Sequence, residues 1–412
     1  MFRPPLTVPF RLLFGSGWVG LCLALPHVVD AQLPKGIVVE KVEVAPDEDA
    51  PAAPYLSLNI DGHTASIKAI AFSPDSRTLY TAGQDKVVHA WRYNDARAKA
   101  FVVEPVGWRK SHTIRWEIAR SIRGSIYGLA VSPRGDTVAI AGFGARGTAG
   151  DIVLADAADG TIDAVARGEH SDSVFGLNYS HDGRWLVSTD LRGKSVLWDV
   201  TRAPPAGRAL QEDARIGSSS SEVFAGRSHV LLRRFKELKK AGGRSMATFE
   251  IDYHNVNTGR SDGRAPITLY ADITALATSR DGRYMAVCDA ARRLYVYKTG
   301  DREATKLFEG QVARSLCFSP DGRYLAVGTM AEGGNVPQVH LWDTTTKKRL
   351  FARALQRSVI SVALSPDGRW LACNGGESHH VFLWEFDGRG GLVDEKAKLL
   401  TGVATSVCQT NI

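Results

Sequence analysis

The sequence predicts an all-β fold in which seven four-stranded antiparallel sheets form the blades of a propeller, and three observations support this. One phrase recurs along the chain: an apolar strand, a Ser-Pro-Asp-Gly-Arg turn and a second apolar strand. A third apolar strand follows most copies and ends in an aromatic residue. Sheets this small cannot bury both faces alone, so radial packing around an axis is expected.

Each copy of the phrase carries a marker serine in its turn. The marker serines are Ser73, Ser132, Ser180, Ser279, Ser319 and Ser365. The interval between Ser180 and Ser279 is about twice the others, and a degenerate copy around Ser228 fills it, which gives seven copies. In the turn, proline sets the first corner, aspartate bonds nearby backbone and glycine takes the left-handed position.

The third strand of each copy is expected shortly after the turn. We predict third strands at residues 87–91, 152–154, 195–198, 294–297, 339–342 and 381–384. Only the second of these lacks an aromatic residue. The fourth strand of the last copy is expected at residues 399–400, although residues 55–60 also stand where a strand could close the ring.

Two Trp-Asp pairs resemble the dipeptide of WD40 repeats, and Gly62-His63 resembles the Gly-His that begins such a repeat. The two pairs are Trp198-Asp199 and Trp342-Asp343. The resemblance covers about residues 55–390, and the Asp-Gly-Arg pattern is also similar to TolB-like propellers of the bacterial envelope. We therefore expect a secreted bacterial member of the WD40-repeat propellers.

The resemblance implies a hydrogen-bonded tetrad inside a blade, made by a histidine, a serine or threonine, an aspartate and the tryptophan. The first copy matches it with His63, Thr81, Asp85 and Trp91. The third copy has His170, Ser188 and Trp198, but Arg192 stands at the aspartate position. The third tetrad is therefore expected to be partial, and the other blades are expected to depend on packing.

The N-terminus resembles a secretion signal. Arg3 and Arg11 precede an apolar stretch at residues 12–25, and Val29-Asp30-Ala31 is a small-residue cleavage pattern. The predicted domains are a signal peptide at 1–31, an extended segment and linker at 32–54, and the propeller at 55–401. Residues 402–412 are predicted to be an incomplete further repeat or a closing strand. An uncleaved anchor, an eighth blade and a truncated larger protein remain alternatives.

Composition limits the function classes. The net charge of +7 is dispersed along the chain, so we predict no nucleic-acid partner. The basic residues between 233 and 244 are expected at a solvated hairpin tip, and the single cysteines are expected in the core. Residues 142–147 match Gly-x-Gly-x-x-Gly, but a strand follows where the dinucleotide fingerprint needs a helix.

No catalytic, metal-binding or cofactor-binding constellation is predicted. Candidate loop residues on a propeller face are Phe143, Arg146, Glu377 and His379. The sequence therefore favours a non-catalytic scaffold, exported from the cytoplasm, that presents loops to partner proteins. The alternatives are an enzyme with an active site in the central channel, similar to quinone-dependent dehydrogenases or lactonases, and the propeller part of a larger multidomain protein.

Overall fold

The computed structural model describes residues 62–94, 107–116, 123–144, 150–211, 223–241, 244–298, 304–375 and 379–400. All of these lie in the second of two compact units, residues 58–412. The described residues form strands and turns, and they contain no helix long and apolar enough to cross a membrane. The segments predicted at 1–31, 32–54 and 402–412 lie outside the described residues.

The strands form seven antiparallel sheets, each made of four strands that follow one another in the chain. We number the sheets as blades one to seven. The first three blades contain β1 (Ile67–Phe72), β2 (Thr78–Gly83), β3 (Val87–Asn94) and β4 (Gly107–Arg115); β5 (Ile126–Val131), β6 (Thr137–Gly142), β7 (Ile152–Asp156) and β8 (Ile162–Ala166); and β9 (Val174–Tyr179), β10 (Trp185–Asp190), β11 (Ser195–Asp199) and β12 (Ala206–Gln211). Blades four and five contain β13 (Val223–Ala225), β14 (His229–Ala241), β15 (Arg244–Asn255) and β16 (Ile267–Leu269); and β17 (Ile273–Thr278), β18 (Tyr284–Asp289), β19 (Arg293–Lys298) and β20 (Ala304–Glu309). Blades six and seven contain β21 (Ala313–Phe318), β22 (Tyr324–Thr329), β23 (Gln338–Asp343) and β24 (Lys348–Ala354); and β25 (Val362–Leu364), β26 (Trp370–Asn374), β27 (Val381–Glu385) and β28 (Lys398–Leu400).

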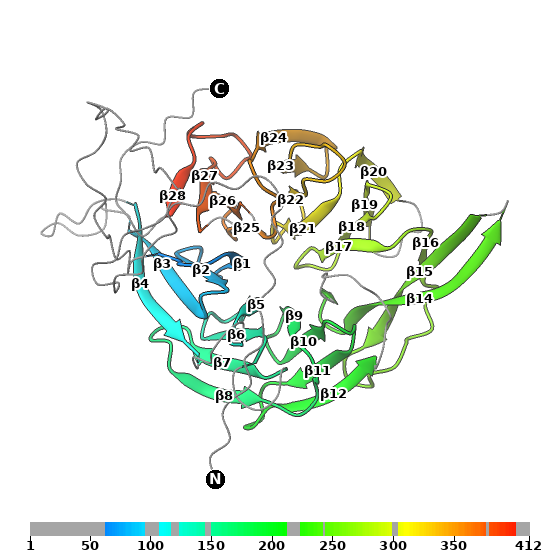
Figure 1. Ribbon diagram of the computed structural model, residues 1–412, viewed down its shortest axis with the longest axis horizontal. Helices are drawn as coiled ribbons and strands as arrows, with labels where there is room; N and C mark the ends of the chain where they lie inside the picture. Colours follow the sequence, from blue (N-terminus) through cyan, green and yellow to red (C-terminus); the bar gives the residue numbers. More distant parts are fainter. Residues whose placement is uncertain are drawn as a thin grey trace, which may run out of the picture. The chain divides into compact units, whose positions relative to one another are not determined.

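The seven blades close into a ring around their first strands (Figure 1). Each first strand contacts the first strand of the next blade, and β25 of blade seven contacts β1 of blade one. The predicted seven-bladed propeller with four-stranded antiparallel blades is therefore confirmed. The direct contact between blades seven and one leaves no place for the eighth blade that the sequence left open.

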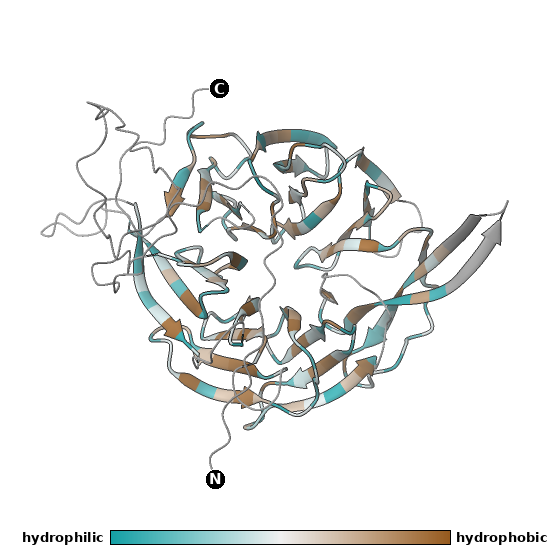
Figure 2. Cartoon of the chain, in the orientation of Figure 1, coloured by the Kyte–Doolittle hydropathy of each residue, from teal (hydrophilic) through white to brown (hydrophobic). Residues whose placement is uncertain are grey.

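The hydrophobic core is divided among the interfaces between blades. The buried apolar residues fall into seven clusters, and each cluster joins two neighbouring blades. Figure 2 shows the corresponding pattern, with apolar residues on the strands and hydrophilic residues in many of the turns. Each blade thus buries both faces against its neighbours, which is how short sheets become stable in a closed ring.

The recurring turns are hydrogen-bonded as their residue types predict. In blade three, the Ser180 hydroxyl donates to Asp182 at 2.6 Å, and the amide of Trp185 donates to that hydroxyl at 2.9 Å. Gly183 has a φ of 72°, in the left-handed region that glycine adopts without strain. In blade one, Ser76 takes this position with a φ of 62°. These polar residues therefore stabilise the fold itself.

The fourth strand of blade seven is β28, which pairs with β27. This agrees with the prediction for residues 399–400, whereas residues 55–60 lie outside the described residues. Among the described residues, every blade is completed by its own fourth strand, so the ring closes through side-chain packing and hydrogen bonds between blades seven and one.

Blade four is the degenerate copy, and its second and third strands extend outward as a long hairpin (Figure 1). The sequence interpretation placed Arg233 in a solvated hairpin tip, and this is wrong. Arg233 is only 2% exposed, and its guanidinium donates to the carbonyl of Ile273 in blade five at 3.2 Å. The next basic residues form ion pairs across the hairpin, Arg234 with Asp252 and Lys236 with Glu250.

Three of the cysteines lie among the described residues. Cys288 and Cys373 are buried and Cys317 is half-buried, and all three are free thiols. Burial raises the pKa of each of these thiols. They therefore act as small core residues, as their single positions in strands predict, while Cys408 lies outside the described residues.

Candidate functional site

The structure places the four tetrad residues of blade one in a continuous chain of hydrogen bonds. His63 is 2.7 Å from the Asp85 carboxylate through Nδ1 and 2.7 Å from the Thr81 hydroxyl through Nε2. Trp91 donates its indole N–H to the same hydroxyl at 2.8 Å. The chain links the segment before β1 to β2, to β3 and to the turn between them, so its role is structural.

Blade three contains a complete tetrad as well, which the sequence interpretation missed. His170 Nδ1 is 3.0 Å from Asp190, His170 Nε2 is 2.6 Å from the Ser188 hydroxyl, and Trp198 donates to that hydroxyl at 2.8 Å. Asp190 is the last residue of β10 and is buried, so its carboxylate reaches the histidine from the strand end. Arg192, at the turn position, is exposed and pairs with Asp172 instead.

The aspartates of the two Trp-Asp pairs hold the arginines of the recurring turns. Arg184 approaches Asp199 at 3.5 Å in blade three, and Arg323 approaches Asp343 at 3.3 Å in blade six. In blade seven, Glu385 has the same role for Arg369 at 2.6 Å. The three arginines also lie over aromatic rings, which are those of Trp185, Tyr324 and Trp370. These Arg-carboxylate pairs join the first turn of a blade to the end of its third strand.

One group of residues in blade one consists of side chains of the types that bind metal ions. The ligand atoms of His63, Asp85 and His89 lie within 4.8 Å of one another. Both nitrogens of His63 are already engaged in the tetrad, and burial lowers the pKa of His89 to about 4. A metal ion would have to displace the bonds that stabilise the blade, so we assign this group to the fold.

The predicted loop residues are only partly described. Phe143 follows β6, half-buried, with the guanidinium of Arg123 5.7 Å from its ring centre. His379 is exposed just before β27, whereas Arg146 and Glu377 lie outside the described residues. The structure therefore does not bring these four residues together as a site, and their role in binding stays a prediction.

A different set of residues lines the centre of the ring. In five blades the first strand begins with a β-bulge, where the register against the second strand shifts by one residue. The residues at the shift are Lys68, Tyr127, Phe175, Thr274 and Arg314. A bulge redirects a side chain away from the regular alternation of the strand. All of these residues except Thr274 line one central cavity.

The central cavity has a volume of about 760 Å³ and is lined from six of the seven blades. Its wall also includes residues from the loops after β2, β22 and β24, among them Gln84, Met330 and Arg357. In an antiparallel blade, the loop after the second strand and the connection to the next blade lie at the same end. The cavity therefore lies at that end of the ring, opposite the Ser-Pro-Asp-Gly turns.

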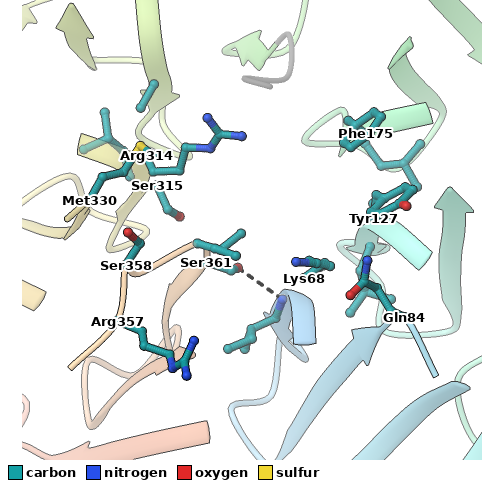
Figure 3. A pocket seen from close by; sticks show the side chains of 18 of the residues that line it. Lys68, Gln84, Tyr127, Phe175, Arg314, Ser315, Met330, Arg357, Ser358 and Ser361 are labelled. Carbon is teal, nitrogen blue, oxygen red and sulfur yellow. Dashed lines mark hydrogen bonds between the residues drawn. The ribbon is translucent and has the colours of Figure 1, made fainter. Parts of the chain in front are cut away.

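The two sides of the cavity differ in chemistry (Figure 3). One side carries Arg314, whose side chain points into the cavity, together with Arg357. The other side carries Tyr127 and Phe175, which stack with ring centres 4.5 Å apart and 11° between the ring planes. Lys68 lies between them, and no carboxylate lines the cavity among the described residues.

Hydroxyl groups bond across the blade interfaces beside the cavity. Ser315 accepts the amide of Val362 at 3.0 Å, joining blades six and seven. Ser361 accepts the amide of Ile70 at 3.2 Å, joining blades seven and one, and Figure 3 shows this bond. The first strands are thereby held in a fixed arrangement, which positions the side chains of the cavity wall.

The sequence interpretation did not identify the cavity residues, although a signal for them exists. Each bulge residue stands five positions before its marker serine: 68 before 73, 127 before 132, 175 before 180, 274 before 279, and 314 before 319. Ile360, before Ser365, lines the same cavity. Counting back from the constant turn would have identified a position whose residue type differs from blade to blade.

Two family models match the chain. The model described as "WD domain, G-beta repeat" matches residues 55–92 and 166–199. A second model, described as an N-terminal beta-propeller domain, matches residues 286–393. The two matches to the WD repeat model include the tetrad residues of blades one and three, but not the fourth strands of these blades.

Several proteins of known identity are similar to this chain. Mouse striatin is 22% identical over 346 residues, covering 77% of this chain and 40% of striatin. Mouse striatin-3 is 22% identical over 343 residues, covering 77% of this chain and 39% of that protein. The beta subunit of a guanine nucleotide-binding protein from Solanum tuberosum is 23% identical over 359 residues, covering 81% of this chain and 84% of that protein.

A solved structure shares the fold. The β-propeller domain of Cps50 (Swd1) from Myceliophteria thermophila superposes with a TM-score of 0.53 at 15% sequence identity. The superposition covers 78% of this chain and 97% of that domain. The chain thus matches nearly the full length of a propeller domain, but it spans less than half the length of the striatins.

Proposed function

Because this chain belongs to the WD40-repeat β-propeller family, we propose that it is a protein-interaction scaffold that holds partner proteins and catalyses no reaction. One of the similar proteins is named as a subunit, which is what a protein that works inside an assembly would be called. Fold alone does not dictate function, so the proposal depends on the site.

One observation carries the proposal. The polar residues that recur in the repeats bond within the fold: the marker serines bind the turns, the turn arginines bind the Trp-Asp carboxylates, and the tetrads bind the strands of their blades. The residue type varies at the bulge position, and this position lines the cavity. A rigid ring with a varied central surface is suited to recognition.

The cavity lining gives less support to the channel-enzyme alternative. Calcium sites take much of their ligand charge from Asp and Glu carboxylates, and the described lining of the cavity contains no Asp or Glu. The charged groups are cations, namely Lys68, Arg314 and Arg357. Such a lining favours binding of an anionic group over calcium-dependent chemistry.

The scaffold proposal is tested by affinity capture with paired variants. Tyr127→Ala with Phe175→Ala changes the cavity end, and Arg77→Ala with Arg134→Ala changes exposed residues in turns at the opposite end. We expect proteins captured by the native chain to be lost with the first pair and retained with the second. Capture that is equal in all three, with native circular dichroism spectra, would contradict binding at the cavity end.

We also propose that the chain acts outside the cytoplasm of a bacterium, because residues 1–31 have the charge and hydrophobicity pattern of an export signal. Fusing residues 1–31 to alkaline phosphatase tests this in a bacterial host. We expect active periplasmic enzyme, and a mature native chain that begins at Gln32. An inactive fusion retained in the cytoplasm would rule out export by this segment.

A further inference from the structure

We propose that the central cavity binds an acidic peptide segment of a partner protein, with a carboxylate on Arg314 and an apolar side chain against Tyr127 and Phe175. The inference rests on the scaffold function proposed above and specifies the chemistry of the partner. It is carried by the charge of the cavity, the environment of Arg314, the hydroxyl donors of the wall and the size of the space.

The charge of the cavity has one sign. Lys68, Arg314 and Arg357 line it, while no aspartate or glutamate does so among the described residues. Other half-buried arginines of the described ring, in contrast to Arg314, do pair with a carboxylate: Arg293 lies 2.7 Å from Asp289 and Arg369 lies 2.6 Å from Glu385. Three cations converging on one space attract an anionic ligand and raise its rate of association.

Arg314 is the anchor of the proposed site. It is half-buried, its side chain points into the cavity, and within the described part of the chain it has no hydrogen bond or ion pair. Burial alone lowers its pKa, without a neighbouring carboxylate to oppose the effect. A guanidinium has five N–H donors in a fixed plane, and a carboxylate satisfies two of them in a bidentate pair.

The wall beside Arg314 offers further hydrogen-bond donors. The hydroxyl oxygens of Ser315 and Ser358 accept backbone amides, from Val362 at 3.0 Å and from Ala331 at 2.9 Å. No acceptor for their hydroxyl protons occurs among the described residues, so each can donate to a ligand. Such a set of donors suits a ligand rich in acceptor oxygens, such as a carboxylate.

The opposite wall and the volume favour a peptide over a single small anion. The stacked rings of Tyr127 and Phe175 provide an apolar surface to which an inorganic anion would make no favourable contact. A cavity of about 760 Å³ lies in the range of pockets that hold organic ligands, about 300–1,000 Å³. Several residues of a peptide would fill it from the cationic side to the aromatic side.

Fluorescence anisotropy with the full chain tests the inference. The probe is a labelled peptide of glutamates around one phenylalanine, compared with a peptide in which glutamine replaces every glutamate. We expect the acidic peptide to bind and the glutamine peptide to bind at least tenfold more weakly. The affinity should also fall as the salt concentration rises, because exposed charges are screened.

Two variants carry the same arginine-to-glutamine substitution in blade six, one in the cavity and one at a control position. Arg314→Gln should weaken binding of the acidic peptide about tenfold or more, because a charge-assisted bond is removed. Arg349→Gln, at an exposed position on the outer strand β24, should leave the affinity within about twofold of the native value. Arg314→Lys keeps the charge but not the bidentate geometry, so its affinity should lie between those of the native chain and of Arg314→Gln.

Three results would overturn the inference: equal affinity of the native chain and a folded Arg314→Gln variant, equal binding of the glutamine peptide, or displacement of the probe by low concentrations of inorganic phosphate. The last result would indicate a small-anion site. These results are distinct from failure of the scaffold proposal. If partner capture still depends on Tyr127 and Phe175 while the acidic peptide does not bind, the scaffold proposal remains valid. Only the proposed chemistry of the partner would then be wrong.

Discussion

Blades three and six have the same four-stranded topology, but the tryptophan of the third strand is held in a different way in each. In blade three the Trp198 indole donates to Ser188, which is backed by His170 and Asp190. In blade six the residue equivalent to Trp198 is Trp342. The residue equivalent to Ser188 is Val327, because each lies opposite the residue two positions before the tryptophan. Ser188 pairs with Val196, and Val327 pairs with His340.

The indole N–H of Trp342 consequently has no acceptor within the described residues. The ring is held by packing instead, stacked with Phe308 at 5.9 Å and with His340 at 6.5 Å between ring centres. The comparison teaches that packing alone can hold the tryptophan of the third strand, so the polar network beneath the ring is optional.

The largest expected effect concerns the buried aspartate of blade three. Asp190→Ala leaves His170 buried without its partner, and we expect it to lower the free energy of unfolding by about 3 kcal/mol. Arg192→Ala removes only an exposed ion pair, so its effect should be within about 1 kcal/mol. Urea unfolding measures both, and similar values for the two variants would show that Asp190 does not complete the tetrad.

The second effect depends on pH. Burial lowers the pKa of His340 and of His89 to about 4, so both are neutral in the fold. Because the unfolded state takes up these protons below about pH 6.5, stability is fully present above that pH and declines as the pH falls toward 4. From these pKa values, the loss at pH 5 should be about 2 kcal/mol per histidine.

The variant His340→Phe keeps the aromatic stack and removes one titrating group. We expect the loss of stability between pH 7 and pH 5 to become smaller by about 2 kcal/mol in thermal unfolding at the two pH values. An unchanged pH dependence would mean that His340 is already accessible to protons in the folded blade.

The third effect compares the two tryptophans directly. Trp198→Phe and Trp342→Phe lose similar apolar contacts, but only the first loses a hydrogen bond and leaves Ser188 without its donor. We expect Trp198→Phe to be more destabilising by about 1 kcal/mol, measured by chemical unfolding. A larger loss for Trp342→Phe would invalidate the assignment of a packing role to that ring.

The smallest effect comes from installing a hydroxyl in blade six. Val327→Thr places an acceptor in the register position of Thr81 and Ser188, near the unpaired indole of Trp342, so the cost should be below about 1 kcal/mol. The matched control is Val287→Thr in blade five, where the third strand carries Tyr297 in place of tryptophan. The control should lose about 1–3 kcal/mol, because it buries a hydroxyl without such a donor. Equal losses of stability in the two variants would show that the hydroxyl introduced at position 327 does not come within hydrogen-bond distance of the Trp342 indole N–H.

The sequence by itself determined the repeated part of this protein. The Ser-Pro-Asp-Gly turn is a local structure, because its bonds join residues a few positions apart, and so the copies, their third strands and the number of blades follow from the chain. The blade-one tetrad could also be predicted from the sequence, because its four residues occupy fixed positions in the repeat.

Only the tertiary structure decided which polar groups meet across space. Asp190 rather than Arg192 reaches His170 because the strand end, not the turn, faces the histidine. Arg233 is buried because blade five covers it. The cavity forms because ring closure brings β1 beside β25, which places Ile70 next to Ser361. Periodicity along a sequence does not encode such long-range contacts, since they depend on register shifts and on the closure of the ring.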